Sequence, residues 1–295
     1  MSYIGRFAPS PTGPLHIGSL IAAVASYLQA RSRQGKWLVR MEDLDPPREV
    51  TGAADDILSC LEHYGFEWDD TVVYQSSRTP CYEDILHSLL KEGLAYHCGC
   101  SRSDINSTGT LNRYGMRYAG TCRNGVRSSR QQQSIRVQTP DSQFSFDDAL
   151  QGHFAQNLFQ DIGDFVIKRA DGQTAYQLAV VIDDAMQSVT EIVRGSDLLD
   201  STPRQIFLQE QLGYVTPDYM HIPVIINDQG NKLSKQTGAR AIDVKSAGRS
   251  LVHALSYLNQ QPPASLAHES VNTIWEWALA NWQPGHISQQ RVINE

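Results

Sequence analysis

The sequence predicts an α/β protein built on a parallel sheet, with an inserted subdomain and a helical C-terminal portion. Strand-like and helix-like segments alternate over the first 95 residues, which is typical of parallel strands joined by crossover helices. This pattern stops between about residues 96 and 160, where Cys, Arg, Gly and Gln cluster. We therefore expect residues 1–95 and 161–215 to form the two halves of one domain, and residues 96–160 to form the insert. Residues 216–295 are expected to carry a lysine-containing loop and a helical stem.

The first half contains the clearest local signals. Residues 17–34 carry apolar side chains at helical spacing and predict a helix that ends at Gly35. Residues 37–41, WLVRM, predict a strand that ends before an acidic cluster and two prolines. Residues 53–64 and 82–92 predict two further helices, each closed by a glycine.

The second half is expected to resume after the insert. Residues 165–168 and 175–183 predict two strands joined by a turn at Asp171 and Gly172. A helix is expected over residues 202–212 and a strand over residues 222–226. The final 50 residues predict helices, because their apolar residues form a stripe at helical spacing.

Composition narrows the class of protein. The 295 residues are 41% hydrophobic and 19% charged, as in ordinary globular proteins. We expect neither secretion nor membrane spanning, because no apolar stretch has the length of a signal peptide core or of a spanning helix. Five cysteines, three of them at Cys98, Cys100 and Cys122, suit a reducing cytoplasm and a metal site. A cytoplasmic monomer is the expectation.

Charge is unevenly distributed along the chain. The net charge of -7 argues against a polyanionic partner, but residues 101–136 contain seven arginines and one acidic residue. Such a segment can attract a phosphate backbone, and a solvated surface is the alternative.

Two segments predict a nucleotide site. RFAPSPTGPLHIGS, residues 6–19, is a loop rich in Pro and Gly that leads into the first predicted helix, so His16 and Gly18 lie where free backbone amides can bind phosphate. The tetrapeptide KLSK follows a predicted strand and places Lys232, Ser234 and Lys235 on a loop, where ammonium groups can stabilise a nucleotidyl-transfer transition state. Taken singly, each segment could also be an ordinary turn or a solvated loop.

Together these segments carry a family resemblance. HIGS and KLSK resemble the HIGH and KMSKS signatures of class I aminoacyl-tRNA synthetases, and their flanks resemble the glutamyl and glutaminyl branch. RMEDLDPPR (residues 40–48), AYQLAVVIDDAMQSVTEIVRGSDLLDSTPRQ (175–205) and HIPVIINDQGNKLSK (221–235) agree with that branch. The resemblance covers roughly residues 3–240 and implies a Rossmann-type catalytic core and an ATP-dependent ligase.

The resemblance also implies roles for individual residues. His16 and Lys235 would be catalytic and would bind ATP with Gly18, Lys232, Ser234 and Mg²⁺. L-glutamate would be activated to glutamyl-adenylate in a pocket where Arg6 and Arg194 bind carboxylates, Glu42 binds the α-ammonium, and Ser10 and Tyr176 complete the site. Position 19 is serine, where the family often has a second histidine or a small residue.

The cysteine segment is expected to bind one structural zinc ion. Cys98, Cys100 and Cys122 supply three thiolates, although C-x-C spacing is tighter than usual, and a closed tetrahedral site needs a fourth ligand. The resemblance selects Tyr118, in YAGTC, over the neighbouring His97. Reduced structural thiols without a metal are the alternative.

The implied acceptor is a tRNA. The C-terminal portion is shorter than the anticodon-binding domains of full synthetases, so the chain resembles the paralogues that transfer glutamate to the queuosine base in the anticodon of tRNA(Asp). One alternative is a glutamyl- or glutaminyl-tRNA synthetase catalytic fragment that charges the tRNA 3′ end. A non-catalytic tRNA-binding module is the other, and the set Arg6, His16, Glu42, Arg194 and Lys235 argues against it.

Overall fold

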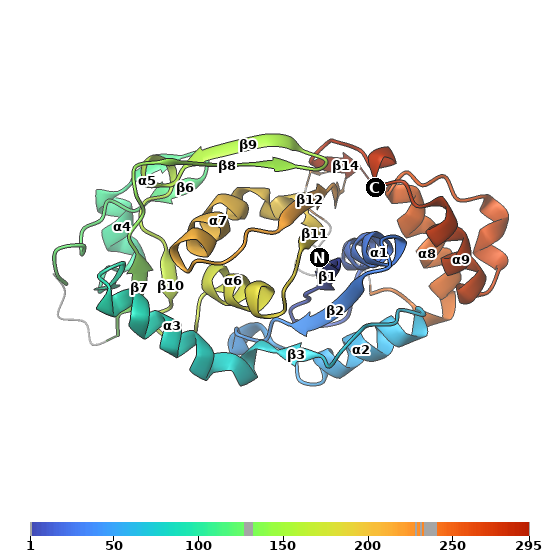
Figure 1. The fold of residues 1–295 in the computed structure, drawn as a ribbon, viewed down its shortest axis with the longest axis horizontal. Helices are drawn as coiled ribbons and strands as arrows, with labels where there is room; N and C mark the ends of the chain where they lie inside the picture. Colours follow the sequence, from blue (N-terminus) through green and yellow to red (C-terminus); the bar gives the residue numbers. More distant parts are fainter. Residues whose placement is uncertain (1, 127–131, 228, 231, 233–240, 295) are drawn as a thin grey trace.

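A parallel sheet lies at the centre of the computed structural model, which describes residues 2–126, 132–227, 229–230, 232 and 241–294. Strands β1 (Ile4–Phe7), β2 (Lys36–Met41) and β3 (Val73–Tyr74) pair in parallel, as do β11 (Glu191–Gly195) and β12 (Asp218–Ile222). The amide of Thr190 donates to the carbonyl of Ile4 at 2.9 Å, which joins β11 to β1. The carboxyl ends of these strands therefore share one edge of the sheet (Figure 1).

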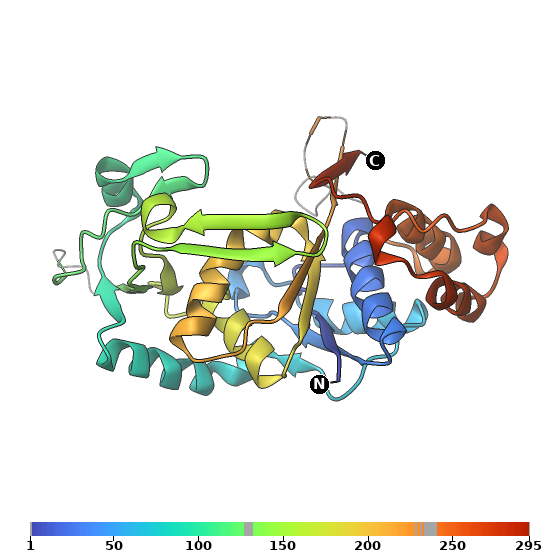
Figure 2. The same cartoon turned by 45° about the horizontal axis from the view of Figure 1, so that its top comes forward.

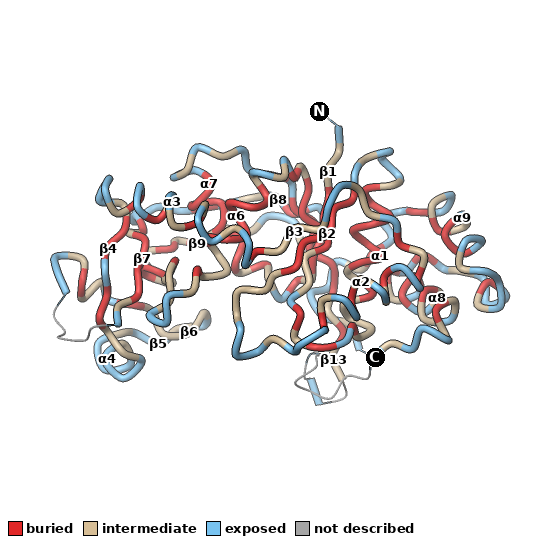
Figure 3. Tube along the Cα trace, turned by 90° about the horizontal axis from the view of Figure 1, so that it is seen from below, coloured by how far each residue is buried: buried red, intermediate tan, exposed pale blue. Residues whose placement is uncertain are grey.

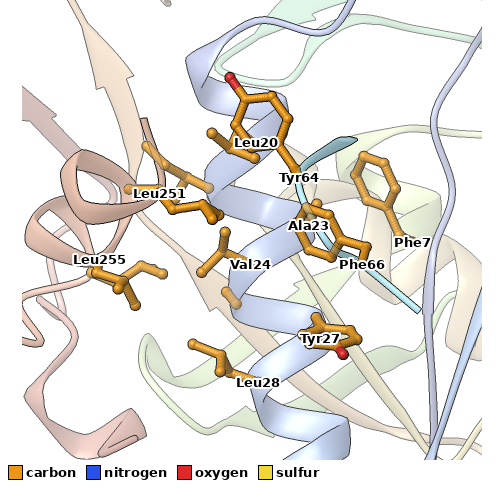
Figure 4. Packing of buried hydrophobic residues seen from close by; sticks show 14 of the residues in the cluster. Phe7, Leu20, Ala23, Val24, Tyr27, Leu28, Tyr64, Phe66, Leu251 and Leu255 are labelled. Carbon is orange, nitrogen blue, oxygen red and sulfur yellow. The ribbon is translucent and has the colours of Figure 1, made fainter. Parts of the chain in front are cut away.

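Helix α1 (Ile17–Ser32) is the centre of the larger hydrophobic cluster. It is buried along most of its length because the sheet covers one side and α8 (Ala247–Tyr257) and α9 (Val271–Asn281) cover the other. Figure 4 shows its apolar side chains between Leu251 and Leu255 of α8 and the rings near the sheet. This packing holds the start of α1 at the edge of the sheet.

The predicted helix ends are confirmed for α2 (Ala53–His63) and α3 (Thr79–Lys91), which are followed by left-handed glycines at φ +72°. At α1 the prediction was wrong in one detail. Gln34 takes the left-handed position, with φ +53°, and Gly35 is required for space, since a Cβ there would lie 2.6 Å from the Tyr3 carbonyl oxygen.

The strand predicted over residues 175–183 is wrong, because this segment is helix α6 (Tyr176–Met186). The turn before it exists, and the amide of Gly172 donates to the carbonyl of Arg169 at 3.0 Å after β10 (Val166–Lys168). Residues 178–184 are buried on every side of the helix, so the apolar run of residues 178–182 shows no helical period.

The strand predicted over residues 222–226 is divided. Pro223 has no amide hydrogen to donate, so β12 ends at Ile222 and β13 (Val224–Ile226) begins a separate pair with β14 (Val292–Asn294). The helix after β11, α7 (Thr202–Gln211), and the predicted helices near the C-terminus, α8 and α9, are confirmed. Short 3₁₀ segments cover Pro46–Arg48, Gln75–Arg78, Ser196–Ser201, Val244–Ser246, Ala264–His268 and Pro284–His286.

A separate group of short elements lies at the end of the molecule opposite α8 and α9 (Figure 1). It contains β4 (Ala95–Cys98), α4 (Arg102–Thr108), β5 (Thr110–Asn112), β6 (Gly115–Arg117), β7 (Ser134–Val137) and α5 (Leu158–Asp161). The hairpin of β8 (Gln143–Asp148) and β9 (Gly152–Asn157) runs from this group back over the core (Figure 2). Its tip contacts β12, where the amide of Ala149 donates to the carbonyl of Tyr219 at 3.0 Å.

Buried residues form two large clusters, one around α1 and the C-terminal helices and one around α3, α6 and α7 (Figure 3). Between them run the strands that carry polar side chains to the edge of the sheet. Among the described helices, none is long and apolar enough to cross a bilayer.

Candidate active site

A cleft of about 780 Å³ opens at the carboxyl edge of the sheet. It brings together the predicted site residues that the structure describes: Arg6, Ser10, His16, Gly18, Glu42, Tyr176, Arg194 and Lys232. Ser234 and Lys235 lie outside the described residues. Segments more than 200 residues apart in the chain therefore supply one site.

The nucleotide side of the cleft is the start of α1. His16 is the N-cap, and its Nδ1 accepts from the Ser19 amide at 3.3 Å while its Nε2 lies 3.1 Å from the Ser19 hydroxyl. The helix begins at the residue after it, so its first free amides and the positive end of its dipole offer an anion site. Ser19 thus has a local role in fixing the ring of His16.

The two ends of the segment 233–240 also lie at this cleft. Lys232 lines it, and its ammonium pairs with Asp197 at 2.5 Å. Beyond the segment, Ala241 pairs with His16, and the amide of Ile242 donates to the carbonyl of Leu15 at 3.0 Å. The described residues on either side of 233–240 therefore lie at the cleft, Lys232 paired with Asp197 and Ala241 paired with His16.

Buried charges organise the side of the cleft that contains Arg6 and Glu42. Arg6 is 4% exposed, and its Nε donates to Asp184 at 3.1 Å. The fully buried Arg40 lies 2.8 Å from Asp184 and 3.5 Å from Glu42. Burial alone would raise the pKa of Asp184, but Arg40 and Arg6 hold that pKa below its usual value.

Glu42 differs from Asp184 in its balance of charges. Burial raises the pKa of Glu42, and the guanidinium groups of Arg40 and Arg6 only partly oppose that rise. A bound ammonium group would supply a further positive charge and favour the ionised carboxylate. The site is therefore suited to an amine.

In the same cleft, a short chain of hydrogen bonds holds Arg194. Its Nε lies 3.0 Å from His221, one terminal nitrogen donates to Thr202 at 2.8 Å, and the other lies 3.4 Å from the Tyr176 hydroxyl. His221 lies 2.6 Å from Asp148, at the end of β8. Burial lowers the pKa of His221 to about 4, so the ring is neutral near pH 7.

Sequence reasoning missed the residues that hold the two arginines of the pocket. Arg40, Asp183 and Asp184 lie in segments that carry the family resemblance, and the adjacent aspartates within an apolar run were a signal of buried ion pairs. His221 lies in β12, two residues before Pro223, but no local pattern connects it to Asp148, 73 residues away.

The mouth of the cleft contains further charged groups. Arg169 lies 2.9 Å from Asp45, and Arg48 pairs with the same carboxylate. Burial acts to raise the pKa of Asp45, but the hydrogen bonds and charges of Arg169 and Arg48 together outweigh it and lower that pKa. Both arginines line the cleft, so a polyanion at the mouth would meet positive charge.

The three predicted cysteine ligands form a cluster in which their sulfur atoms lie within 4.8 Å of one another. The Tyr118 hydroxyl lies 3.3 Å from the Cys98 sulfur and 3.6 Å from the Cys100 sulfur, and Cys100 and Cys122 are 3.6 Å apart. Zinc–sulfur bonds of about 2.3 Å in a tetrahedron place sulfur atoms about 3.8 Å apart, so the donor set fits Zn²⁺. His97 alternates with Cys98 on β4 and is exposed.

The arginines of residues 101–136 are only partly available to a partner. Arg123 pairs with Asp164, Arg117 donates to the carbonyl of Phe159 at 2.7 Å, and Arg136 lies over the Tyr118 ring at 3.9 Å. These arginines stabilise the insert itself. Arg102 and Arg113 remain exposed, and Arg127 and Arg130 lie outside the described residues.

The fold and the cleft define the catalytic domain of a class I tRNA synthetase. Residues 4–259 match the family described as tRNA synthetases class I (E and Q), catalytic domain. The fold is also similar to a glutamate tRNA ligase of Elizabethkingia meningosepticum solved with its amino acid, with a TM-score of 0.76 and 23% identity over 98% of this chain and 66% of that one. Glutamate-tRNA synthetase of Elizabethkingia anophelis gives a TM-score of 0.78 at 22% identity, covering 98% and 67% of the two chains.

Curated relatives match at higher identity. A glutamyl-Q tRNA(Asp) synthetase of Chromobacterium violaceum is 55% identical over 97% of this chain and 95% of that protein, and one of Dechloromonas aromatica is 52% identical over 99% and 97%. The Pseudomonas aeruginosa protein of the same name is 49% identical over 100% and 98%. The chain therefore belongs to the class I tRNA synthetases of the glutamate and glutamine group, and within them to the family of these glutamyl-Q tRNA(Asp) synthetases.

Proposed function

We propose that the protein is an ATP-dependent ligase that activates L-glutamate and transfers it to the queuosine base in the anticodon of tRNA(Asp). The observation that carries the first step is the convergence of Arg6, Arg194 and Glu42 in the cleft that also contains the start of α1. Two guanidinium groups and one carboxylate complement the two carboxylates and one ammonium of glutamate. The names of the relatives support the acceptor.

Adenylation would occur between the two sides of the cleft. The glutamate α-carboxylate attacks the α-phosphorus of ATP, a carboxyl–phosphorus bond forms, and pyrophosphate leaves. The amides at the start of α1, with His16 and Gly18, would bind the phosphates, and Lys232, Ser234 and Lys235 would neutralise charge on them as the bond breaks. Mg²⁺, bound with ATP, would screen the phosphate charge.

Glutamate would lie with its ammonium at Glu42 and its carboxylates at Arg6 and Arg194, with Ser10 and Tyr176 completing the pocket. The raised pKa of Glu42 supports this orientation, because an ammonium partner stabilises its ionised form. Asp184 accepts a hydrogen bond from the Arg6 Nε, which keeps this carboxylate-binding group in place before substrate binds.

One zinc ion would bind Cys98, Cys100, Tyr118 and Cys122 and fix the insert. Without a cation, burial raises the pKa of Cys100 to about 11 and also raises that of Tyr118, so a divalent ion is needed to hold these groups as anions. We assign residues 96–160 to this insert, residues 1–95 and 161–215 to the catalytic halves, and residues 216–295 to the loop and stem. Cysteines without disulfides suit a reducing cytoplasm, and we propose a cytoplasmic monomer.

Labelled glutamate tests the proposal directly. With ATP and Mg²⁺, the protein should label tRNA(Asp) that carries queuosine and should not label tRNA(Asp) without it or tRNA(Glu). Labelling of tRNA(Glu) at its 3′ end would return the chain to the ordinary glutamyl-tRNA synthetases. Absence of glutamate-dependent ATP–pyrophosphate exchange would leave only a tRNA-binding module.

A further inference from the structure

His221 is placed to control the orientation of Arg194. The two residues are direct neighbours on the parallel strands β12 and β11, and the Arg194 Nε lies 3.0 Å from the His221 Nε2. An arginine Nε always carries a hydrogen, so Nε2 must be the acceptor and the ring proton must be on Nδ1. The side chain of His221 is fully buried, so bulk solvent does not reach Nε2.

Asp148 selects this tautomer. Its Oδ2 lies 2.6 Å from the His221 Nδ1 and accepts that proton. Its Oδ1 accepts backbone amides of Leu150 at 3.0 Å, Gln151 at 2.9 Å and His221 at 3.1 Å, so the carboxylate has little freedom to turn. The tip of the β8–β9 hairpin, a segment remote from the cleft in sequence, thereby reaches the glutamate side of the site.

Other groups around His221 reinforce the arrangement. The Tyr219 ring lies nearly parallel to the imidazole, with an interplanar angle of 10° and a centroid distance of 5.9 Å. Arg194 and Asp148 are its charged neighbours, and Asp197 acts on it from a greater distance. If Nε2 were protonated, it and the Arg194 Nε would be two N–H donors facing each other across 3.0 Å. The guanidinium would then lose this hydrogen bond.

We propose that His221, held in its Nδ1-protonated tautomer by Asp148, is the positioning residue that aims the Arg194 guanidinium at a carboxylate of the amino-acid substrate. The proposal rests on the proposed function, in which Arg194 binds glutamate. Three of the five N–H donors of Arg194 are directed at His221, Thr202 and Tyr176, so its remaining donors have a fixed direction before substrate arrives.

Two substitutions at one position test the acceptor. In His221→Gln the amide oxygen takes the place of Nε2, so Arg194 keeps a hydrogen-bond acceptor. In His221→Asn the shorter side chain can replace only Nδ1, so Arg194 loses its acceptor. We expect the Asn variant to raise the KM for glutamate about tenfold or more, with kcat and the KM for ATP within about threefold, and the Gln variant to remain near the wild type. Equal effects of the two substitutions on the glutamate KM would overturn the proposal.

The tautomer is measured without reference to activity. In ¹⁵N-histidine-labelled protein, the His221 signals should show a neutral, Nδ1-protonated ring, and an Nε2-protonated ring in the wild type would overturn the proposal. In Asp148→Asn the side-chain oxygen should keep the three backbone amides, so the NH₂ group would face the His221 Nδ1. Nδ1 must then accept a hydrogen bond, so the ring proton should move to Nε2 and the glutamate KM should rise. This pair of measurements also covers the case in which the His221 variants do not fold.

Asp147→Asn is the matched control. Asp147 is the preceding residue of β8, is largely exposed, and pairs with the exposed His153 rather than with His221. It should leave the His221 tautomer and the glutamate KM unchanged. Arg194→Ala distinguishes failure of the proposed glutamate site from failure of the positioning role. Unchanged ATP–pyrophosphate exchange in Arg194→Ala would refute the glutamate site. Lost exchange in Arg194→Ala, together with an unchanged glutamate KM in His221→Asn, would refute only the positioning role.

Discussion

Replacing Arg194 by alanine removes a carboxylate-binding group whose geometry the structure defines. Three of its five N–H donors serve His221, Thr202 and Tyr176, which leaves at most two hydrogen bonds for a substrate carboxylate. Hydrogen bonds to charged groups contribute about 1.5–3 kcal/mol each, so we expect a loss of about 3–6 kcal/mol of transition-state stabilisation. That corresponds to a fall of about 10²- to 10⁴-fold in kcat/KM for glutamate.

The assay is ATP–pyrophosphate exchange as a function of glutamate concentration. Arg249→Ala is the control, because Arg249 is exposed on α8 and is not among the residues that line the cleft. The Arg194→Ala variant should remain folded, because the Thr202 hydroxyl lies 3.3 Å from the His221 Nε2 and can donate to it in place of the arginine. A folded Arg194→Ala protein whose kcat/KM for glutamate is within threefold of the wild type would refute the assignment of Arg194 to the substrate.

Three further outcomes are expected. Lys235→Ala should reduce the rate of adenylate formation in single turnovers by about 10²-fold or more and leave the glutamate Kd nearly unchanged, because a charge that acts on the leaving phosphates stabilises only the transition state. A glutamate affinity that falls by the same factor as the rate would contradict that role. Elemental analysis should find one zinc per chain, and Cys122→Ser should lower the zinc content and the Tm; wild-type protein purified without chelator and free of zinc would contradict the site. The pKa of His221 falls from 6.5 to about 4 on folding, so its contribution to stability is complete above pH 6.5 and is lost as the pH falls toward 4. Urea unfolding should show about 2 kcal/mol of this loss between about pH 7.5 and 5, and His221→Gln should remove that part of the pH dependence.

Much of the fold was predictable because its signals are local. The helices of residues 53–63 and 79–91 begin and end at ordinary signals of proline, glycine and amphipathic spacing. Helix α6 was predicted as a strand because its buried residues lie on all of its faces, which removes the period that distinguishes the two structures. The pairing of β13 with β14 joins residues more than 60 positions apart and has no local signal.

In the candidate site too, residues in local motifs were predictable from the sequence, whereas long-range contacts were not. Segments 6–19 and 40–48 contain Arg6, His16 and Glu42, and the resemblance of these segments was sufficient to assign them to one family and one substrate class. It also placed three cysteines and Tyr118 in one short segment, so the metal donors could be proposed without a structure.

What only the tertiary structure decided is how these groups are held. Arg40 joins Asp184 to Glu42, and Asp148 reaches His221 from a hairpin that the sequence assigned to a different subdomain. Hydrogen bonds and ion pairs of this kind depend on which strands become neighbours, and a single sequence contains no periodicity or spacing that records such long-range contacts. The sequence by itself therefore determined which chemical groups the protein possesses, whereas the burial and orientation that set their pKa values and directions arose only when distant strands packed together.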